Sequence, residues 1–378
     1  MSQVQRPHSP RAEDSGPDRP TAVVYCEANF GAIDGKTANG LVRHSERYRI
    51  LSVIDSGQAG SDAGEVLGDG RNGIPITTDL ADAVRSAGHV PDYLIFGMAP
   101  ASGMLSTTER TVMLDAMSRG MNLVNGLHEF LNDDAEFAAA SAAYGVTIID
   151  VRQPRDKTEL RMFSGRIAEV TCPRIAVLGT DSAIGKRTTA TILTKALIAR
   201  GLKAVMVGTG QTGLIQGARY GVALDAIPCQ FCSGEMEAAM VDAFEGEHPD
   251  VIVIEGQGAL SHPAYLSSAF ILRGSRPDAV ILQHAPARTR LSDFGDIVMP
   301  NVADEIRLIE TFADTEVIGL TINHENMSEA EVTAAIAMYE TELSLPATDA
   351  LTMPTERLVQ MVTRRFPTLD KTPVFVAR

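Results

Sequence analysis

Short apolar runs alternate with longer amphipathic stretches from residue 21 onward. In the first half of the chain the apolar runs predict strands at Ala22–Cys26, Tyr48–Ile54, Tyr93–Gly97, Asn122–Asn125 and Val146–Val151. The amphipathic stretches predict helices at Thr37–Glu46, Leu80–Ala87, Thr108–Arg119 and Ala135–Tyr144. Uninterrupted strands rich in valine and isoleucine, separated by helices, are typical of a parallel sheet buried on both faces. We therefore predict an α/β domain over residues 21–151.

The same alternation resumes in the second half and predicts a second α/β domain over residues 172–378. Its predicted strands are Arg174–Leu178, Ala204–Val207, Val251–Glu255, Ala279–Gln283, Val317–Thr321 and Pro373–Val376. Its predicted helices are Arg187–Ala199, Glu235–Phe244, Ala303–Phe312, Glu329–Glu340 and Thr355–Phe366. The stretch Leu260–Asp278 has no clean period, so we expect an irregular segment that lines a site.

Two segments flank these domains. Residues 1–20 contain four prolines, charges of both signs and no apolar run, and they lack the apolar core of a secretory signal. We predict a disordered leader there. Residues 152–171 are strongly charged and contain Pro154 and Gly165 as helix breakers. We predict that they connect the two domains.

Composition excludes several classes of protein. Acidic residues outnumber basic ones, 48 against 33, so the formal net charge is −15, which disfavours binding to nucleic acid or to an anionic membrane. No apolar run approaches the ~18 residues of a membrane span. The pair Cys229 and Cys232 lacks the further ligands of a zinc site, so we expect two buried, reduced cysteines and no metal site. We expect a cytoplasmic protein that acts on small molecules.

One loop carries the clearest chemical signal. A buried strand at Ile175–Leu178 leads into a loop with Gly179 and Gly185, followed by Lys186 and a long helix, which is the context of a phosphate-binding P-loop. Glycines allow backbone N–H groups to turn inward, and the helix start and the lysine add positive charge. We expect a cofactor to bind at Gly179, Thr180, Asp181, Ser182, Ala183, Ile184, Gly185, Lys186, Arg187, Thr188 and Thr189.

The spacing departs from the common P-loop pattern. Five residues separate the two glycines, and Arg187 stands where serine or threonine usually follows the lysine. A hydroxyl for Mg²⁺ could come from Thr188 or Thr189. Magnesium binding is therefore less strongly indicated than phosphate binding.

Two further strand ends fit the same site. The sequence GTGQTG predicts an open loop after the second strand of this domain, and this loop adds three expected cofactor contacts, Gly210, Gln211 and Thr212. The sequence EGQGALSHPAY follows the third strand and offers Glu255 and His262 as catalytic candidates, with substrate contacts expected at Gly256, Gln257 and Tyr265. For Glu255 the alternative is a solvated strand end, and for His262 a structural role. The first domain lacks the glycine fingerprint of dinucleotide-binding folds, so we do not expect NAD there.

These motifs resemble two families. GTDSAIGK and EGQGAL are similar to the P-loop and to an acidic motif of dethiobiotin synthetase. A resemblance over most of the chain is carried by FGAIDGKTANGLVRHSERY, GMNLVNGLHEFLNDD, FSGRI, GTDSAIGKRTTA and EGQGALSHPAY. On these motifs the chain is identified as a member of the DgcN-type family of D-glutamate N-acetyltransferases. That resemblance implies an N-terminal Rossmann-like domain and a C-terminal P-loop NTPase-like domain.

The resemblance also implies a function. It implies acetyl transfer from acetyl-CoA to the amine of an acidic amino acid, D-glutamate, in D-amino-acid catabolism, with the P-loop binding coenzyme A phosphates. We also expect a homo-oligomer. Two alternatives stay open: an ATP-dependent ligase of the dethiobiotin synthetase type, which would use Mg-ATP, and a nucleotide-binding regulator without catalytic activity.

Overall fold

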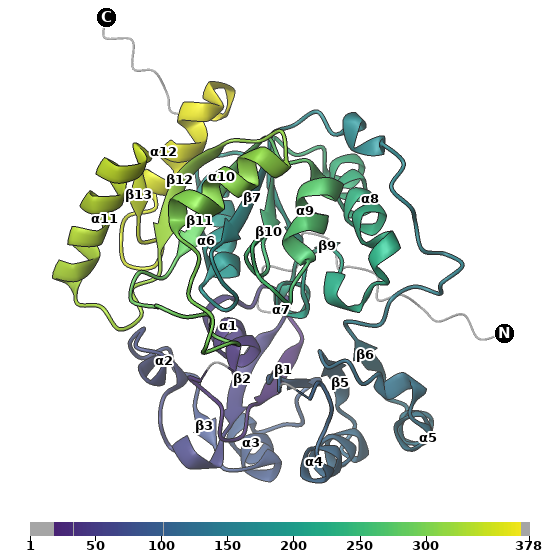
Figure 1. Ribbon diagram of the computed structural model, residues 1–378. Helices are drawn as coiled ribbons and strands as arrows, with labels where there is room; N and C mark the ends of the chain where they lie inside the picture. Colours follow the sequence, from purple (N-terminus) through teal and green to yellow (C-terminus); the bar gives the residue numbers. More distant parts are fainter. Residues whose placement is uncertain (1–18, 33, 101, 372–378) are drawn as a thin grey trace, which may run out of the picture. The chain divides into compact units, whose positions relative to one another are not determined.

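The computed structural model describes residues 19–32, 34–100 and 102–371 and divides them into two compact units. The N-terminal unit comprises the chain up to Gln153 together with Gln211–Arg219, and the C-terminal unit comprises the remainder (Figure 1). Most of the predicted leader and the predicted strand Pro373–Val376 lie outside the described residues. Among the residues that are described, none of the helices is both long and apolar enough to span a membrane.

The N-terminal unit contains a six-stranded parallel sheet with the strand order β3-β2-β1-β4-β5-β6. Its strands are β1 (Thr21–Tyr25), β2 (Arg49–Ile54), β3 (Ile76–Thr77), β4 (Tyr93–Phe96), β5 (Asn122–Asn125) and β6 (Ile148–Asp150). Its helices are α1 (Lys36–His44), α2 (Ala63–Val66), α3 (Leu80–Ala87), α4 (Thr107–Ser118) and α5 (Ala135–Tyr144), with 3₁₀ turns at Ser56–Gln58 and Leu131–Asp133. The predicted parallel α/β domain is confirmed.

Local sequence fixes where these helices begin and end. Asp79 accepts a hydrogen bond from the backbone N–H of Asp82 at the start of α3, and Gly88 ends that helix in the left-handed region at φ 73°. Ser106 and Glu109 form a capping box at the start of α4. These are the residue types that sequence rules place at helix ends, and the predicted bounds of α3 agree with the structure.

A helix from the second half of the chain completes the N-terminal unit. Helix α7 (Gln211–Gln216) lies at the start of α1, where the Thr37 and Thr212 hydroxyls are 2.9 Å apart. Its Ile215 is buried in the core of this unit. A Cβ on Gly126, directly after β5, would lie 3.2 Å from the Gln211 and Ile215 side chains. Helix α7 therefore occupies the carboxyl edge of the sheet near the point where the strand order reverses.

That edge is where Rossmann-type sheets hold dinucleotides. The acidic residue at the end of β2, Asp55, is 1% exposed and accepts hydrogen bonds from the backbone N–H groups of Phe30 (3.0 Å) and Gly57 (3.1 Å). Its carboxylate therefore holds the neighbouring loops together.

The C-terminal unit contains a seven-stranded parallel sheet with the strand order β13-β12-β11-β7-β10-β8-β9. Its strands are β7 (Arg174–Gly179), β8 (Ala204–Gly208), β9 (Tyr220–Gly221), β10 (Val251–Glu255), β11 (Ala279–His284), β12 (Val317–Ile322) and β13 (Ala347–Thr348). Its helices are α6 (Lys186–Ala199), α8 (Cys229–Glu247), α9 (Ser267–Ser275), α10 (Val302–Phe312), α11 (Glu329–Leu343) and α12 (Glu356–Arg365), with 3₁₀ turns at Arg166–Glu169, Leu224–Ala226 and Pro367–Leu369.

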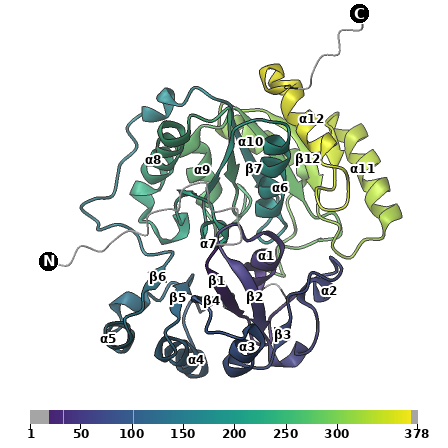
Figure 2. The ribbon, with the colours of Figure 1, turned by 180° about the vertical axis from the view of Figure 1, so that it is seen from behind.

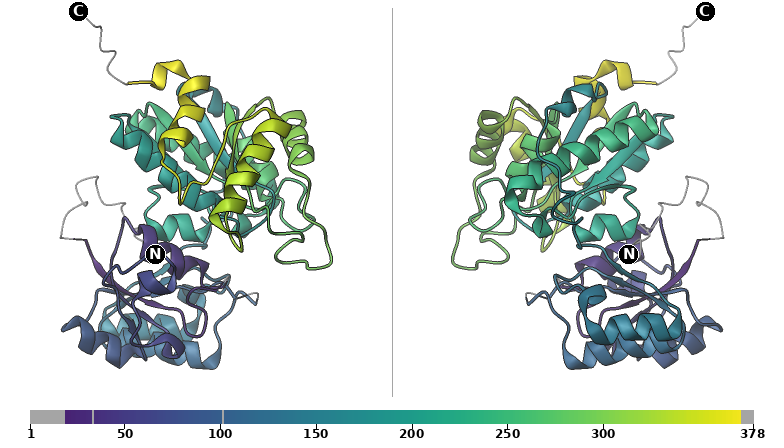
Figure 3. Two further views of the ribbon diagram at one scale, coloured as in Figure 1. Left: turned by 90° about the vertical axis from the view of Figure 1, so that its left-hand side faces the viewer. Right: turned by 90° about the vertical axis from the view of Figure 1, so that its right-hand side faces the viewer.

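Both faces of this sheet are covered. Ala176 and Leu178 of β7 pack in a core with α8, α9, α10 and α11 (Figure 1). Ile175 and Val177 face the opposite way, into a core with α6 and α12 (Figure 2). The side views show helices on both sides of the sheet (Figure 3). This alternation explains the unbroken apolar pattern of the predicted strands.

Two details of this unit correct the predictions. The stretch Leu260–Asp278 is not wholly irregular, because it contains helix α9, whose Gly274 packs closely on α8: a Cβ there would lie 2.6 Å from the Met236 Cβ. Helix α8 begins at Cys229, six residues before its predicted start. Cys232 is buried as predicted, but Cys229 is exposed on the first turn of that helix.

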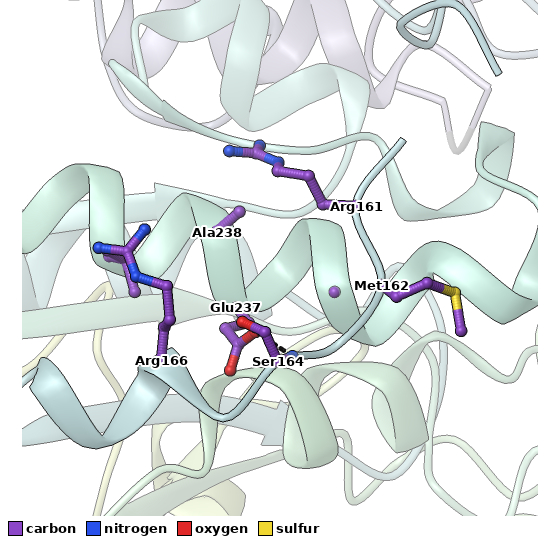
Figure 4. Close-up of a pocket in the computed structure, with 8 residues that line it drawn as sticks. Arg161, Met162, Ser164, Arg166, Glu237 and Ala238 are labelled. Carbon is purple, nitrogen blue, oxygen red and sulfur yellow. Dashed lines mark hydrogen bonds between the residues drawn. The ribbon is translucent and has the colours of Figure 1, made fainter. Parts of the chain in front are cut away.

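The predicted connection follows a defined path over α8. Within it, the backbone N–H of Arg161 donates to Glu235 (2.7 Å), and those of Ser164 (2.7 Å) and Ile167 (3.1 Å) donate to Glu237. The two glutamates are 4% and 2% exposed. Beside them lies a cavity of about 290 Å³ (Figure 4) whose lining residues are Arg161, Met162, Ser164, Arg166, Gly234, Glu237, Ala238 and Val241.

Candidate functional site

The loop between β7 and α6 has the backbone of an anion-binding turn. Gly185 precedes the helix at φ 99°, and Ala183 also adopts a positive φ of 48°. Gly179 is tightly enclosed, because a Cβ there would lie 2.8 Å from Ile184 Cδ1 and 2.9 Å from the Gln283 carbonyl oxygen. The glycines at both ends of the loop are therefore required by geometry.

Lys186 begins α6 and is 4% exposed. Its Nζ donates to the carbonyl oxygen of Asp181, within the same loop. The start of a helix carries partial positive charge, and a buried ammonium group adds a full charge beside it. This donor set suits a phosphate group, and the fit supports the predicted P-loop.

The threonine hydroxyls of the loop have partners on β11. Thr180 Oγ1 lies 2.8 Å from His284 Nδ1, and Thr189 Oγ1 donates to Gln283 Oε1 at 2.6 Å. Burial lowers the pKa of His284 to about 4, so the ring is neutral near pH 7.

Asp181 is fully buried and is held by residues that the sequence did not single out for this role. Its Oδ2 accepts from Arg288 Nη1 at 2.8 Å and from the backbone N–H of Ser292 at 2.9 Å. Arg288 also pairs with Glu325 at 2.7 Å. Because the Arg288 guanidinium already binds two carboxylates, it is poorly suited to bind a substrate carboxylate.

A second contact joins the P-loop to the segment after β11. The Ser182 hydroxyl donates to Asp293 Oδ2 at 2.8 Å, and the Tyr265 hydroxyl donates to the same oxygen at 2.9 Å. Tyr265 therefore lies beside the P-loop. Asp293 is an exposed loop residue without a motif, so nothing in the sequence marked it.

Glu255 ends β10 and is 5% exposed. Its Oε2 accepts the backbone N–H of Thr209 at 3.0 Å. Burial raises the pKa of Glu255, and this effect is opposed by Arg187, by the N–H groups of Thr209 and Gly210, and by Lys186. The alternative of a solvated strand end is therefore wrong, and Glu255 lies near the two predicted phosphate-binding cations.

The residues around Glu255 are tightly packed. A Cβ on Gly256 would lie 2.1 Å from the Val177 carbonyl oxygen, so β10 needs glycine at its end. Gln257 Nε2 donates to the carbonyl oxygen of Thr209, which fixes the glycine- and threonine-rich loop after β8. Gly210 packs closely on the Gln257 side chain, because a Cβ at Gly210 would lie 2.9 Å from Gln257 Nε2.

Gln211 and Thr212 differ from expectation in conformation. The sequence predicts an open loop, whereas both residues belong to α7 of the N-terminal unit. Gln211 Oε1 accepts from Arg152 at 2.9 Å, and Thr212 contacts Thr37. The glycines favoured a loop prediction, but burial of Ile215 stabilises a helix instead.

His262 lies in the turn after Glu255 and is 5% exposed. Its Nδ1 accepts the backbone N–H groups of Ala264 (3.2 Å) and Tyr265 (3.3 Å), and its ring stacks on Tyr265 with centroids 4.4 Å apart. Its Nε2 lies 3.9 Å from Asp181 Oδ1. His262 therefore lies next to the P-loop.

Glu305 of α10 holds the start of this turn. It is 1% exposed and accepts hydrogen bonds from the backbone N–H of Leu260 at 2.6 Å and from the Ser261 hydroxyl at 2.5 Å. Burial raises the pKa of Glu305, against the effect of these hydrogen bonds. This residue was missed because it lies on a separate helix far along the chain.

Comparisons with known proteins extend this picture. Residues 161–359 match the family described as "Domain of unknown function (DUF1611_C) P-loop domain", and residues 56–154 match its "Rossmann-like domain", DUF1611_N. A crystal structure of a DUF1611 family protein from Anabaena variabilis is similar, with a TM-score of 0.84 and 31% identity, and the match covers 92% of this chain and 100% of that one.

Two curated relatives are named D-glutamate N-acetyltransferase. The protein from Tritonibacter scottomollicae is 34% identical over 294 residues, which is 76% of this chain and 85% of the relative. The protein from a Pseudoalteromonas species is 30% identical over 289 residues, 74% of this chain and 84% of the relative. The whole-chain resemblance inferred from the motifs is confirmed, and this chain belongs to the DUF1611 family, with its Rossmann-like N-terminal domain and its P-loop C-terminal domain.

Proposed function

We propose that this protein is an N-acetyltransferase that transfers the acetyl group of acetyl-CoA to the amine of an acidic amino acid, D-glutamate. The observation that carries the proposal is the similarity, over about three quarters of the chain, to two proteins of that name. Acetyl-CoA and the amino acid are substrates in this scheme.

The P-loop is the proposed site for the phosphates of coenzyme A. Lys186 and the helix start behind Gly185 offer charge and N–H groups to a compact phosphate cluster. Arg187 adds a second cation where magnesium-dependent P-loops have a hydroxyl.

The reaction needs a base and hydrogen-bond donors. The ammonium group of the amino acid must lose one proton to the base before the nitrogen attacks the thioester carbon. The C–N bond then forms and the C–S bond breaks, and the nitrogen loses a second proton, which the leaving thiolate of coenzyme A takes up. Glu255 is the proposed base, because burial raises its pKa towards the working range. The backbone N–H group of Gly256 is a proposed donor to the developing oxyanion.

A thiol-release assay tests the proposal. Purified protein is incubated with acetyl-CoA and a panel of D- and L-amino acids, in excess EDTA and without nucleotide. We expect release of coenzyme A with D-glutamate and formation of N-acetyl-D-glutamate by mass spectrometry. If turnover instead requires Mg-ATP and releases ADP, the ligase alternative replaces this function; binding of nucleotide without turnover would favour the regulator.

A further inference from the structure

One buried donor beside the P-loop has no partner. Among the described residues, His262 Nε2 makes no hydrogen bond, although its side chain is fully buried and Nε2 itself is inaccessible to solvent. The nearest carboxylate oxygen, Asp181 Oδ1, lies 3.9 Å away, which is beyond hydrogen-bond distance. A buried donor left unsatisfied costs free energy, so such groups in native proteins require an explanation.

The surroundings of the ring determine which nitrogen carries the proton. Nδ1 faces two backbone N–H groups, those of Ala264 and Tyr265, and can accept them only if it is unprotonated. The neutral ring therefore carries its proton on Nε2. A proton on Nδ1 would point at the N–H groups of Ala264 and Tyr265, which would repel it. Burial also disfavours the charged ring and lowers the pKa of His262. In this arrangement the ring offers no free lone pair, so His262 is not a base.

The charges around the ring are those of the P-loop site. Asp181, Asp293 and Lys186 are the charged groups that act on His262. Asp181 already accepts hydrogen bonds from Arg288 and from the backbone N–H of Ser292, which hold it in place. Lys186 and the Nε2–H group are therefore two donors in the same region, one of them without an acceptor.

We propose that His262 acts as a neutral hydrogen-bond donor, through its Nε2–H group, to an anionic oxygen of the substrate bound at the P-loop. This rests on the function proposed above. Two oxygens have the required chemistry: a phosphate oxygen of coenzyme A and the oxyanion formed at the thioester carbon. Either one supplies the acceptor that Nε2–H lacks.

The cover over the ring is compatible with access by a substrate. Tyr265 stacks on the ring and is 40% exposed, and Phe294, with its centroid 5.6 Å away, is 38% exposed. Both are exposed side chains on loops, so in this proposal a substrate reaches Nε2 when they rotate, a movement that for Tyr265 breaks its hydrogen bond to Asp293.

Two substitutions separate a donor from a base. His262→Gln places an amide N–H near the position of Nε2, whereas His262→Phe keeps an aromatic ring for Tyr265 but removes the donor. The exposed His248 adopts φ 47°, a conformation that asparagine tolerates, so His248→Asn is the matched control for loss of a histidine. Circular dichroism and thermal melting verify that each variant is folded.

We expect His262→Phe to lose about ten- to 150-fold in coenzyme A affinity or in kcat, and His262→Gln to recover most of that loss. A raised Kd identifies the phosphate as the acceptor, and a lowered kcat with unchanged Kd identifies the oxyanion. Nitrogen-15 NMR of the histidines should show Nε2 protonated. Equal loss in both variants with a shifted pH–rate profile, no loss in His262→Phe, or a proton on Nδ1 would each overturn the proposal.

Failure of the proposed function is distinguishable. If the wild-type protein releases no thiol from acetyl-CoA, the acetyltransferase function fails, and only a phosphate remains as the acceptor. Titration with inorganic pyrophosphate then decides the role of His262. A weaker affinity in His262→Phe supports the donor, and an unchanged affinity overturns it.

Discussion

Replacing Lys186 by alanine tests the phosphate site directly. Lys186 is 4% exposed at the start of α6, so its charge acts where water screens it little. A hydrogen bond to a charged group contributes roughly 1.5–3 kcal/mol, which corresponds to about a ten- to 150-fold change in affinity. We therefore expect Lys186→Ala to raise the KM for acetyl-CoA by that factor, with a smaller change in the KM for the amino acid.

The assay must separate binding from folding. Calorimetric titration with coenzyme A gives the Kd, and thiol release at varied acetyl-CoA gives the KM. Lys195→Ala is the matched control, because Lys195 is an exposed lysine on the same helix. Lys186→Met keeps the volume of the side chain if the alanine variant unfolds. An unchanged Kd in a folded variant, or a loss confined to the KM of the amino acid, would refute the assignment of Lys186 to coenzyme A phosphates.

Three further predictions concern stability and reactivity. Burial raises the pKa of Glu255 above the ordinary value of 4.5, so ionisation of this carboxyl destabilises the folded state as the pH rises. The free energy of unfolding of Glu255→Gln, measured by urea titration relative to wild type, should therefore be higher at about pH 8 than at about pH 4. An equal difference at the two pH values would contradict this. Gly256→Ala should lower the melting temperature strongly, because its Cβ would lie 2.1 Å from a backbone oxygen, whereas Gly295→Ala, in open space, should not. Cys229 is the exposed cysteine and should alone react rapidly with a thiol reagent, a phase that Cys229→Ser removes; rapid reaction of a second thiol would contradict the burial of Cys26, Cys172 and Cys232.

Long buried elements were predictable from the sequence. Strand β10 agrees with its prediction at both ends because all five of its residues are buried, which makes the apolar run continuous up to Glu255. Strands β3, β9 and β13 contain two residues each and lie at the edges of their sheets. They are too short to carry a period that a sequence pattern could show. Helix α9 was missed because its sequence, SSAFILRGS, mixes serine and glycine with a short apolar run.

The site likewise contains residues that the sequence could predict and residues that it could not. Glu255 ends one buried strand and Lys186 comes after the loop that follows another. Because the carboxyl ends of parallel strands meet at one edge of a sheet, their proximity could be inferred. Arg288, Asp293 and Glu305 reach the site from segments without a recognisable motif, and only the tertiary fold brings them there. The role of His262 depends on two backbone N–H groups, which no residue pattern specifies.

The position of α7 has a consequence for biosynthesis. A nascent chain that has been synthesised up to Gln153 contains every described strand of the N-terminal sheet, but it lacks Ile215 and the helix that completes its core. Domains generally fold as units during synthesis, with the N-terminal one first. Here the first unit cannot finish folding until the ribosome has also made β7, α6 and β8 of the second. A fragment cut after Gln153 would therefore leave the Thr37 and Gly126 contact surface uncovered.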